Sequence, residues 1–243
     1  MVIEIQSDWV RGSTISLANM AYEQIEYRLT MLDIRPGDPI NDSALAAELG
    51  VGRTPVREAL KRLEDDRLVV SYPRRGTSAT VVDVTELDAI SDVRQLLVPH
   101  TARRAAENAT PYQRAELRST AERILGLEVA AGDRTTFINE DLAIHQLIYR
   151  ATGNPHLEDV LVRYDHLATR IWCLVIDTLP DLVHHIHEHT SLLDAITDGD
   201  GDTAAALALE HVTSFERAIR GVLHAYGPGA PIAPTAIDRR RSG

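Results

Sequence analysis

Residues 50–62, GVGRTPVREALKR, decide the fold of this chain because they predict a turn followed by a short basic helix. Arg53, Arg57 and Lys61 are spaced four residues apart, so they share one face of that helix. A helix that docks by an apolar side and presents arginines on the other can read the major groove of DNA, because a guanidinium bonds guanine bidentately. A solvated surface helix is the alternative that this stretch alone leaves open.

The segment before this stretch favours DNA reading. Asn41-Asp42-Ser43 offers an N-cap to a helix over residues 44–49, and Gly50 stands where its C-cap belongs. A helix, a tight turn with glycine and a basic helix follow one another at the spacing of a helix-turn-helix.

The segment after it predicts a wing. Strand-like runs at 68–70 and 80–82 flank Pro73-Arg74-Arg75-Gly76, which indicates a hairpin with arginines and a glycine at its tip. Such a tip can reach a minor groove or a phosphate. We therefore expect a winged helix-turn-helix domain over residues 10–82.

Charge and composition agree with this division. The chain has 243 residues and a formal net charge of −11, yet residues 51–80 hold seven Lys and Arg against four acids. The single cysteine, Cys173, excludes an internal disulfide and suits a reducing compartment. No apolar run reaches membrane-spanning length and no signal peptide is apparent, so we expect a cytoplasmic protein without a membrane partner.

The rest of the chain is expected to be all-helical, which makes the fold mainly α. We assign residues 84–226 to this second domain and residues 227–243, rich in Pro and Gly, to a disordered tail. Turn and cap signals predict six helices, at 85–108, 111–131, 134–152, 154–178, 181–198 and 202–226. The sequence DGDGD at 198–202 is interpreted as a capped turn, because the bidentate Glu of a calcium loop is missing.

Four polar residues are expected to point into this helical core. Asp141 and His145 lie on one face of the helix predicted at 134–152, within its apolar arc. His189 and His211 lie on the apolar stripes of two other helices, whereas His184 and His187 project away and are expected to be solvated. Buried imidazoles with one carboxylate suit a divalent transition metal: Zn, Ni, Mn or Fe. His185 is a possible substitute ligand.

Arg94 also projects into the helical core and needs an anionic partner. A small carboxylate bound at the metal would provide one. The alternative is a structural ion pair between Arg94 and Asp141.

The N-terminal third resembles the GntR family of bacterial transcription regulators. Pro36-Gly37, Leu49-Gly50-Val51, residues 53–60 and Arg75-Gly76 carry the resemblance. It implies base contacts by Arg53 and Arg57, a phosphate contact by Thr54 and a wing tip at Gly76 in the minor groove. The expected DNA-binding set is Arg53, Thr54, Arg57, Lys61, Arg74, Arg75 and Gly76. Gly52 stands where the family usually has a capping Ser or Thr. Ser43 stands where some members carry a base-reading Arg.

The helical half resembles the FCD effector domain of the FadR-type branch, with six helices as in the vanillate-regulator subgroup. Arg94, the Asp141/His145 pair, Gly153-Asn154-Pro155 and the spacing of His189 and His211 carry this resemblance. It implies metal ligation by Asp141, His145, His189 and His211 and an effector contact by Arg94. Val98 stands where this family commonly has Glu.

The sequence thus predicts a homodimeric, ligand-responsive regulator, by resemblance a repressor, that binds pseudo-palindromic operator DNA and a small carboxylate effector. Two alternatives remain: the same regulator with a purely structural metal and a non-carboxylate effector, or a metal-dependent hydrolase fused to a DNA-binding domain. We expect no enzyme, because no general base stands out beside the predicted ligands.

Overall fold

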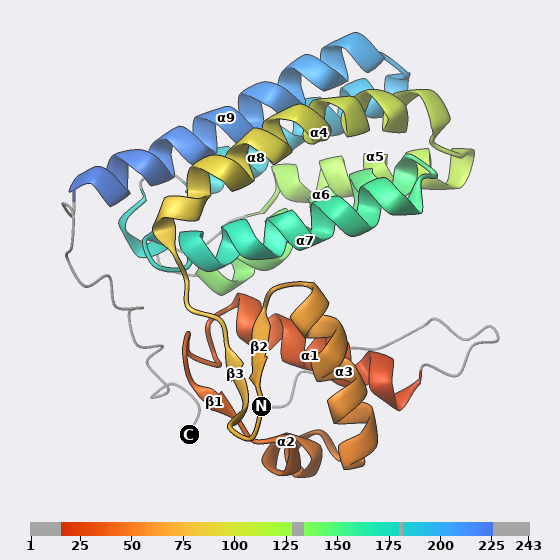
Figure 1. The fold of residues 1–243 in the computed structure, drawn as a ribbon. Coiled ribbons are helices and arrows are strands. Elements are labelled where there is room, and N and C mark those ends of the chain that lie inside the picture. Colours follow the sequence, from red (N-terminus) through yellow and green to blue (C-terminus); the bar gives the residue numbers. More distant parts are fainter. Residues whose placement is uncertain (1–15, 128–133, 180–181, 226–243) are drawn as a thin grey trace. The chain divides into compact units, whose positions relative to one another are not determined.

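The computed structural model describes residues 16–127, 134–179 and 182–225 (Figure 1). The chain divides into two compact units, one ending at Val81 and the other beginning at Val82. The tail expected at 227–243 lies outside the described residues. Among the described residues, no helix combines the length and apolar character needed to cross a membrane.

The first unit combines three helices with a small antiparallel sheet. The helices are α1 (Leu17–Thr30), α2 (Asp42–Leu49) and α3 (Arg53–Asp65), and the strands are β1 (Pro39–Ile40), β2 (Val69–Tyr72) and β3 (Gly76–Ala79). The strand order is β1-β3-β2, with Val69 opposite Ala79 and Tyr72 opposite Gly76. Helix α1 packs on α3, where Ile25 and Leu29 meet the buried apolar side predicted for the basic helix.

Caps set the ends of the two central helices. The Asn41 side chain accepts hydrogen bonds from the N–H groups of Ser43 and Ala44, so α2 begins at Asp42, two residues earlier than expected. Gly50 adopts a left-handed conformation with φ of 66°, and its N–H bonds back to the end of α2. The turn into α3 therefore needs glycine at this position.

The second strand of the wing was predicted in the wrong place. It spans Gly76–Ala79 instead of residues 80–82, because β2 and β3 pair directly across the turn at 73–75. The β-branched run that suggested a strand follows the end of β3, and Val81 is 73% exposed. Strand β1 and helix α1 were not anticipated.

The second unit is a helical bundle, and its described part contains the six helices expected (Figure 1). They are α4 (Leu87–Asn108), α5 (Pro111–Leu125), α6 (Arg134–Ala151), α7 (Pro155–Trp172), α8 (Leu182–Asp198) and α9 (Gly201–Ala225). Short 3₁₀ turns lie at Val84–Glu86 and Ile176–Thr178, so the helix predicted at 154–178 ends earlier, at Trp172. Helix α4 packs along α9 and α5 along α8, and α6 contacts α4, α7 and α8.

Local signals fix the helix starts of this unit. Thr110 and Gln113 form a reciprocal capping box ahead of α5. Asn154 caps α7, with Pro155 in its first turn. These caps set the start and rotation of α7, which carries Asp165 into the core.

Candidate nucleic-acid interface and metal centre

The basic face of α3 is open to solvent. Arg53, Thr54, Arg57 and Lys61 are exposed, while the opposite side of the helix is buried on α1. The side chains of Arg53 and Arg57 are 56% and 64% exposed. This is the arrangement that the spacing of the basic residues predicts, and it leaves their guanidinium groups accessible to base edges.

An acidic residue that sequence reasoning passed over holds these two arginines. Asp42 Oδ2 accepts hydrogen bonds from Arg57 Nε at 2.7 Å and from Arg53 Nη2 at 3.2 Å. Bonds from Arg57 and Arg53 keep the pKa of Asp42 below its ordinary value. Asp42 follows the N-cap, and its position at the start of α2, facing the start of α3, was the signal available for this contact.

The wing presents its arginines at an exposed turn. Arg75 N–H donates to the Tyr72 carbonyl, and Arg74 and Gly76 have positive φ of 63° and 88°. A Cβ added at Gly76 would meet no atom within 4 Å, so the backbone angle, not the space, favours glycine here. Arg74, Arg75 and Gly76 are all exposed.

Three helices of the second unit bring the predicted metal ligands together. Asp141 and His145 come from α6, His189 from α8 and His211 from α9, and all four are buried. One candidate ligand atom of each lies within 4.8 Å of those of the other three. His145 Nε2 lies 3.4 Å from His189 Nε2, and Asp141 Oδ1 lies 3.6 Å from His189 Nε2.

In each of the three predicted histidine ligands, Nδ1 faces a hydrogen-bond acceptor on the side away from the cluster. Tyr149 donates its only hydroxyl proton to Asp165 Oδ2 at 2.8 Å, so toward His145 Nδ1, at 3.2 Å, its oxygen can only accept. His189 Nδ1 lies 3.2 Å from the Ile186 carbonyl, and His211 Nδ1 lies 3.0 Å from Glu188 Oε2. Each Nδ1 therefore carries the proton, and each Nε2 has a free lone pair.

The Nε2 lone pairs and Asp141 Oδ1 face one another inside the bundle. Asp141 Oδ1 makes no hydrogen bond of good geometry among the described residues, and His185 Nε2 lies 3.4 Å from it. Four buried acceptors facing one another are unfavourable unless a cation lies among them. Imidazole nitrogens and one carboxylate oxygen are the donor set of Zn²⁺ and similar ions, so the residues fit a metal.

Burial keeps the imidazoles in the form that binds metal. It lowers the pKa of His145 to about 4 and that of His211 to about 3, so both are neutral at pH 7. Burial opposes ionisation of Asp141, but His145 and His185 hold the pKa of that carboxyl well below its usual range. A neutral imidazole and an ionised carboxylate are the states that ligation requires.

The neighbouring histidines behave differently from one another. His185 is buried, with Nε2 at 3.4 Å from Asp141 Oδ1 and Nδ1 at 3.3 Å from Glu188 Oε2. His184 is exposed, as expected. His187 is only half-exposed, and its Nε2 is buried without a hydrogen bond among the described residues, so the prediction of full solvation was wrong for His187.

Arg94 points into the bundle as expected, and its ion-pair partners are not Asp141, which the structural alternative named. Its Nε donates to Asp165 Oδ1 at 2.9 Å and its Nη1 to Glu216 Oε1 at 3.0 Å. All three side chains are 2–3% exposed. Val98, which stands at the family's glutamate position, is buried, and the carboxylates that reach Arg94 come from α7 and α9. Asp165 and Tyr149 link Arg94 to His145 by hydrogen bonds.

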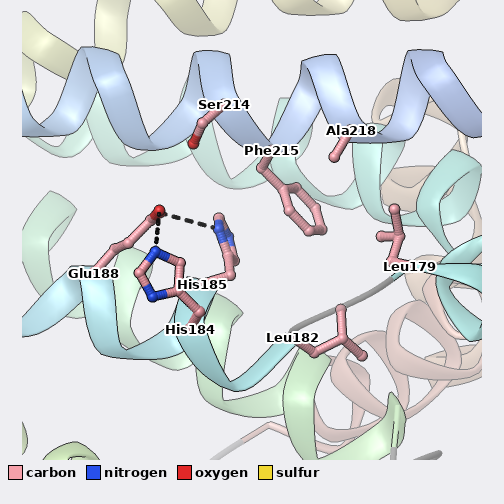
Figure 2. A pocket seen from close by; sticks show the side chains of 8 residues that line it. All are labelled: Leu179, Leu182, His184, His185, Glu188, Ser214, Phe215 and Ala218. Carbon is pink, nitrogen blue, oxygen red and sulfur yellow. Dashed lines mark ion pairs between the residues drawn. The ribbon is translucent and has the colours of Figure 1, made fainter.

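Figure 2 shows a pocket whose lining includes His185 and Glu188, which contact Asp141 and His211 of the buried cluster. It encloses about 160 Å³ and has an apolar side and a polar side. Its lining residues are Leu179, Leu182, His184, His185, Glu188, Ser214, Phe215 and Ala218. None of the four predicted ligands is among them, so Glu188 and His185 separate the pocket from the cluster.

Comparisons with known proteins agree with both units. Residues 17–78 match the family described as bacterial regulatory proteins, gntR family, and residues 89–214 match the FCD domain. The chain is 30% identical over 180 residues to the Nta operon transcriptional regulator of Aminobacter aminovorans, covering 73% of this chain and 82% of that protein. It is 27% identical to the galactonate operon transcriptional repressor of Escherichia coli K12, with 77% and 90% covered. The structure of E. coli McbR/YncC has the same fold, with a TM-score of 0.74 at 24% identity, covering 86% and 99% of the two chains.

Proposed function

This chain belongs to the GntR family of bacterial regulatory proteins and carries an FCD domain, and we propose that it is a metal-containing repressor. A small effector would raise or lower its affinity for operator DNA. The chain is a transcription regulator with a DNA-binding helix-turn-helix unit. The relatives that it matches are regulators and not enzymes. The repressor role is inferred from the galactonate operon repressor and from the repressor RspR of E. coli K12, which is 22% identical.

The DNA contacts are assigned to the exposed face of α3 and to the wing. Arg53 and Arg57 would bond base edges in the major groove, and Lys61 and Thr54 would contact phosphates. Arg74, Arg75 and Gly76 would enter the minor groove. A homodimer would bring two such units to the half-sites of a pseudo-palindrome. The exposure of all seven residues supports this assignment.

The metal is assigned to Asp141, His145, His189 and His211, and the convergence of three imidazoles and one carboxylate in a buried cluster carries the proposal. The ion is Zn, Ni, Mn or Fe. Three imidazoles and one carboxylate leave coordination positions open when the metal prefers more than four ligands.

A small carboxylate effector would take such an open position on the metal. It would reach the guanidinium of Arg94 only by displacing Asp165 or Glu216, both of which are buried on it. We therefore refine the role expected for Arg94: it supports His145 through Asp165 and Tyr149, and the carboxylate binds the metal itself. Effector binding changes DNA affinity by linkage between the two units.

Metal analysis and operator binding test this function together. We expect purified protein to bind one metal equivalent, His189→Ala to lose it, and His100→Ala, a control at an exposed histidine of α4, to keep it. A panel of small carboxylates should then change operator affinity for the metal-loaded protein and for the control. Wild-type protein that binds no divalent ion would refute the metal site.

The structural-metal alternative is favoured by one observation, the near-complete burial of all four predicted ligands. It predicts that metal removal lowers stability while no carboxylate alters operator affinity. The same titrations therefore separate it from the effector-bearing metal.

A further inference from the structure

Glu188 on α8 lines the pocket (Figure 2) and also contacts His211 of the buried cluster. Its Oε2 lies 3.0 Å from His211 Nδ1 and 3.3 Å from His185 Nδ1. Its side chain is 30% exposed, because it forms part of the pocket wall. The other two acceptors behind the ligands, Tyr149 and the Ile186 carbonyl, belong to fully buried residues. Among the three acceptors that face Nδ1 of the predicted ligands, Glu188 is therefore the one that also lines the pocket.

Three imidazoles lie near Glu188: those of His185 and His211 near Oε2, and that of His184 with Nε2 at 3.6 Å from Oε1. The rings of His185 and His211 are stacked, with centroids 4.1 Å apart and planes 15° from parallel. Nδ1 of both rings lies near the same oxygen, Oε2 of Glu188. We interpret this arrangement as two N–H groups that share one carboxylate oxygen.

The charge of Glu188 distinguishes it from the other supports. His189 donates to a neutral carbonyl, and His145 donates to a hydroxyl that relays to Asp165. Only His211 donates directly to a carboxylate. An anionic acceptor fixes the tautomer of a metal-binding imidazole and makes its other nitrogen a stronger ligand.

We infer that Glu188 is a positioning residue that holds His211 in the Nδ1–H tautomer and aims its Nε2 at the metal. The inference rests on the metal site proposed above. In this role Glu188 acts through His211 and is not itself a ligand of the proposed metal. His185, stacked on His211 and also on Phe215 at 4.1 Å, keeps the ring of His211 from turning away.

Cobalt titration of the full-length chain tests this role. Co²⁺ affinity is measured by competition with a chelator for wild type, Glu188→Gln and Glu188→Ala. Loss of such a support typically costs about 10–100-fold in metal affinity, so we expect that loss in Glu188→Ala and a smaller one in Glu188→Gln, whose amide oxygen still accepts. The visible spectrum of bound Co²⁺ should shift in Glu188→Ala, a change that a purely structural role would not produce. Glu210→Gln is the matched control, since Glu210 precedes His211 on α9 but is exposed.

The pocket allows a second arm, chemical rescue. In Glu188→Ala the cavity extends to the missing carboxylate, so acetate can enter and accept the His211 proton. We expect acetate to restore part of the Co²⁺ affinity of Glu188→Ala and to leave wild type unchanged. Unchanged affinity and spectrum in both variants would overturn the inference. A wild type that binds no Co²⁺ would instead overturn the metal site. If Glu188→Ala fails to fold, Glu188→Gln decides the question by its affinity and spectrum.

Discussion

Replacing Arg94 with alanine should strongly destabilise the helical unit. Arg94 pairs with both Asp165 and Glu216 and offsets one of their two negative charges, and all three side chains are almost fully removed from water. The substitution would leave two buried carboxylates without their cation. Removing one partner of a buried ion pair costs about 3–5 kcal/mol, because the remaining charge stays desolvated.

The expected size of the effect can be measured by thermal unfolding. For a chain of this length, about 2–4 °C of melting temperature corresponds to each kcal/mol, so Arg94→Ala should melt on the order of 6–20 °C lower. The control is Arg103→Ala, which removes an exposed pair with Asp202. Exposed pairs contribute about 0–1 kcal/mol, so this variant should melt within about 4 °C of wild type.

A triple variant separates the effect of charge from that of shape. Arg94→Met, Asp165→Asn and Glu216→Gln together remove all three charges and keep similar volumes. This variant should be more stable than Arg94→Ala, because no buried carboxylate is left without a cation. A loss of less than about 1 kcal/mol in Arg94→Ala alone would refute the reasoning, since the carboxylates would then not depend on the guanidinium.

Three further predictions concern other parts of the chain. Arg57→Ala should weaken operator binding by about 1–3 kcal/mol in fluorescence anisotropy, and unchanged affinity would remove Arg57 from the base-reading set. Gly50→Ala should lower the free energy of unfolding by about 1–2 kcal/mol in denaturant, because the residue has a φ of +66°. No neighbour lies within 4 Å of an added Cβ, so the backbone angle is the only source of this cost, and a neutral result would show that the turn tolerates L-residues. Metal-free protein should lose stability as the pH falls from 6.5 toward 4, because unfolded imidazoles take up protons near pH 6.5 whereas folded His145 does so at about 4. His185, whose pKa Asp141 and Glu188 raise despite burial, opposes this trend, but His211 and His189 add to it; a stability independent of pH over this range would contradict the prediction.

Periodicity was sufficient to predict which residues face the helical core. Asp141, His145, His189 and His211 were placed inward from their positions on apolar stripes, and all four are buried together. The number of helices in this unit also followed from caps and turns, since Thr110 and Asn154 cap as expected. Their roles as ligands stay a prediction.

Pairings between distant helices could not be predicted in the same way. Arg94 was expected to contact an effector carboxylate, with Asp141 as the alternative partner, yet it pairs with Asp165 and Glu216, which lie 71 and 122 residues away in sequence. Which of several inward carboxylates an arginine meets depends on helix packing and on the residues around them, and a helical projection describes one helix at a time. The wing strand was misplaced for a related reason, because strand ends depend on the pairing register as well as on β-branched composition.

The contact of Asp42 with Arg53 and Arg57 has a consequence for the search along DNA. Before any operator is met, an internal carboxylate offsets one of the two positive charges on the reading helix. Non-cognate DNA, which offers these side chains mainly phosphates, must compete with this carboxylate and releases fewer counterions in doing so. A cognate site adds base edges, and hydrogen bonds to them offset the loss of the contacts between Asp42 and the arginines. We therefore expect Asp42 to lower residence on random sequence more than residence on the operator, and so to widen the ratio between the two.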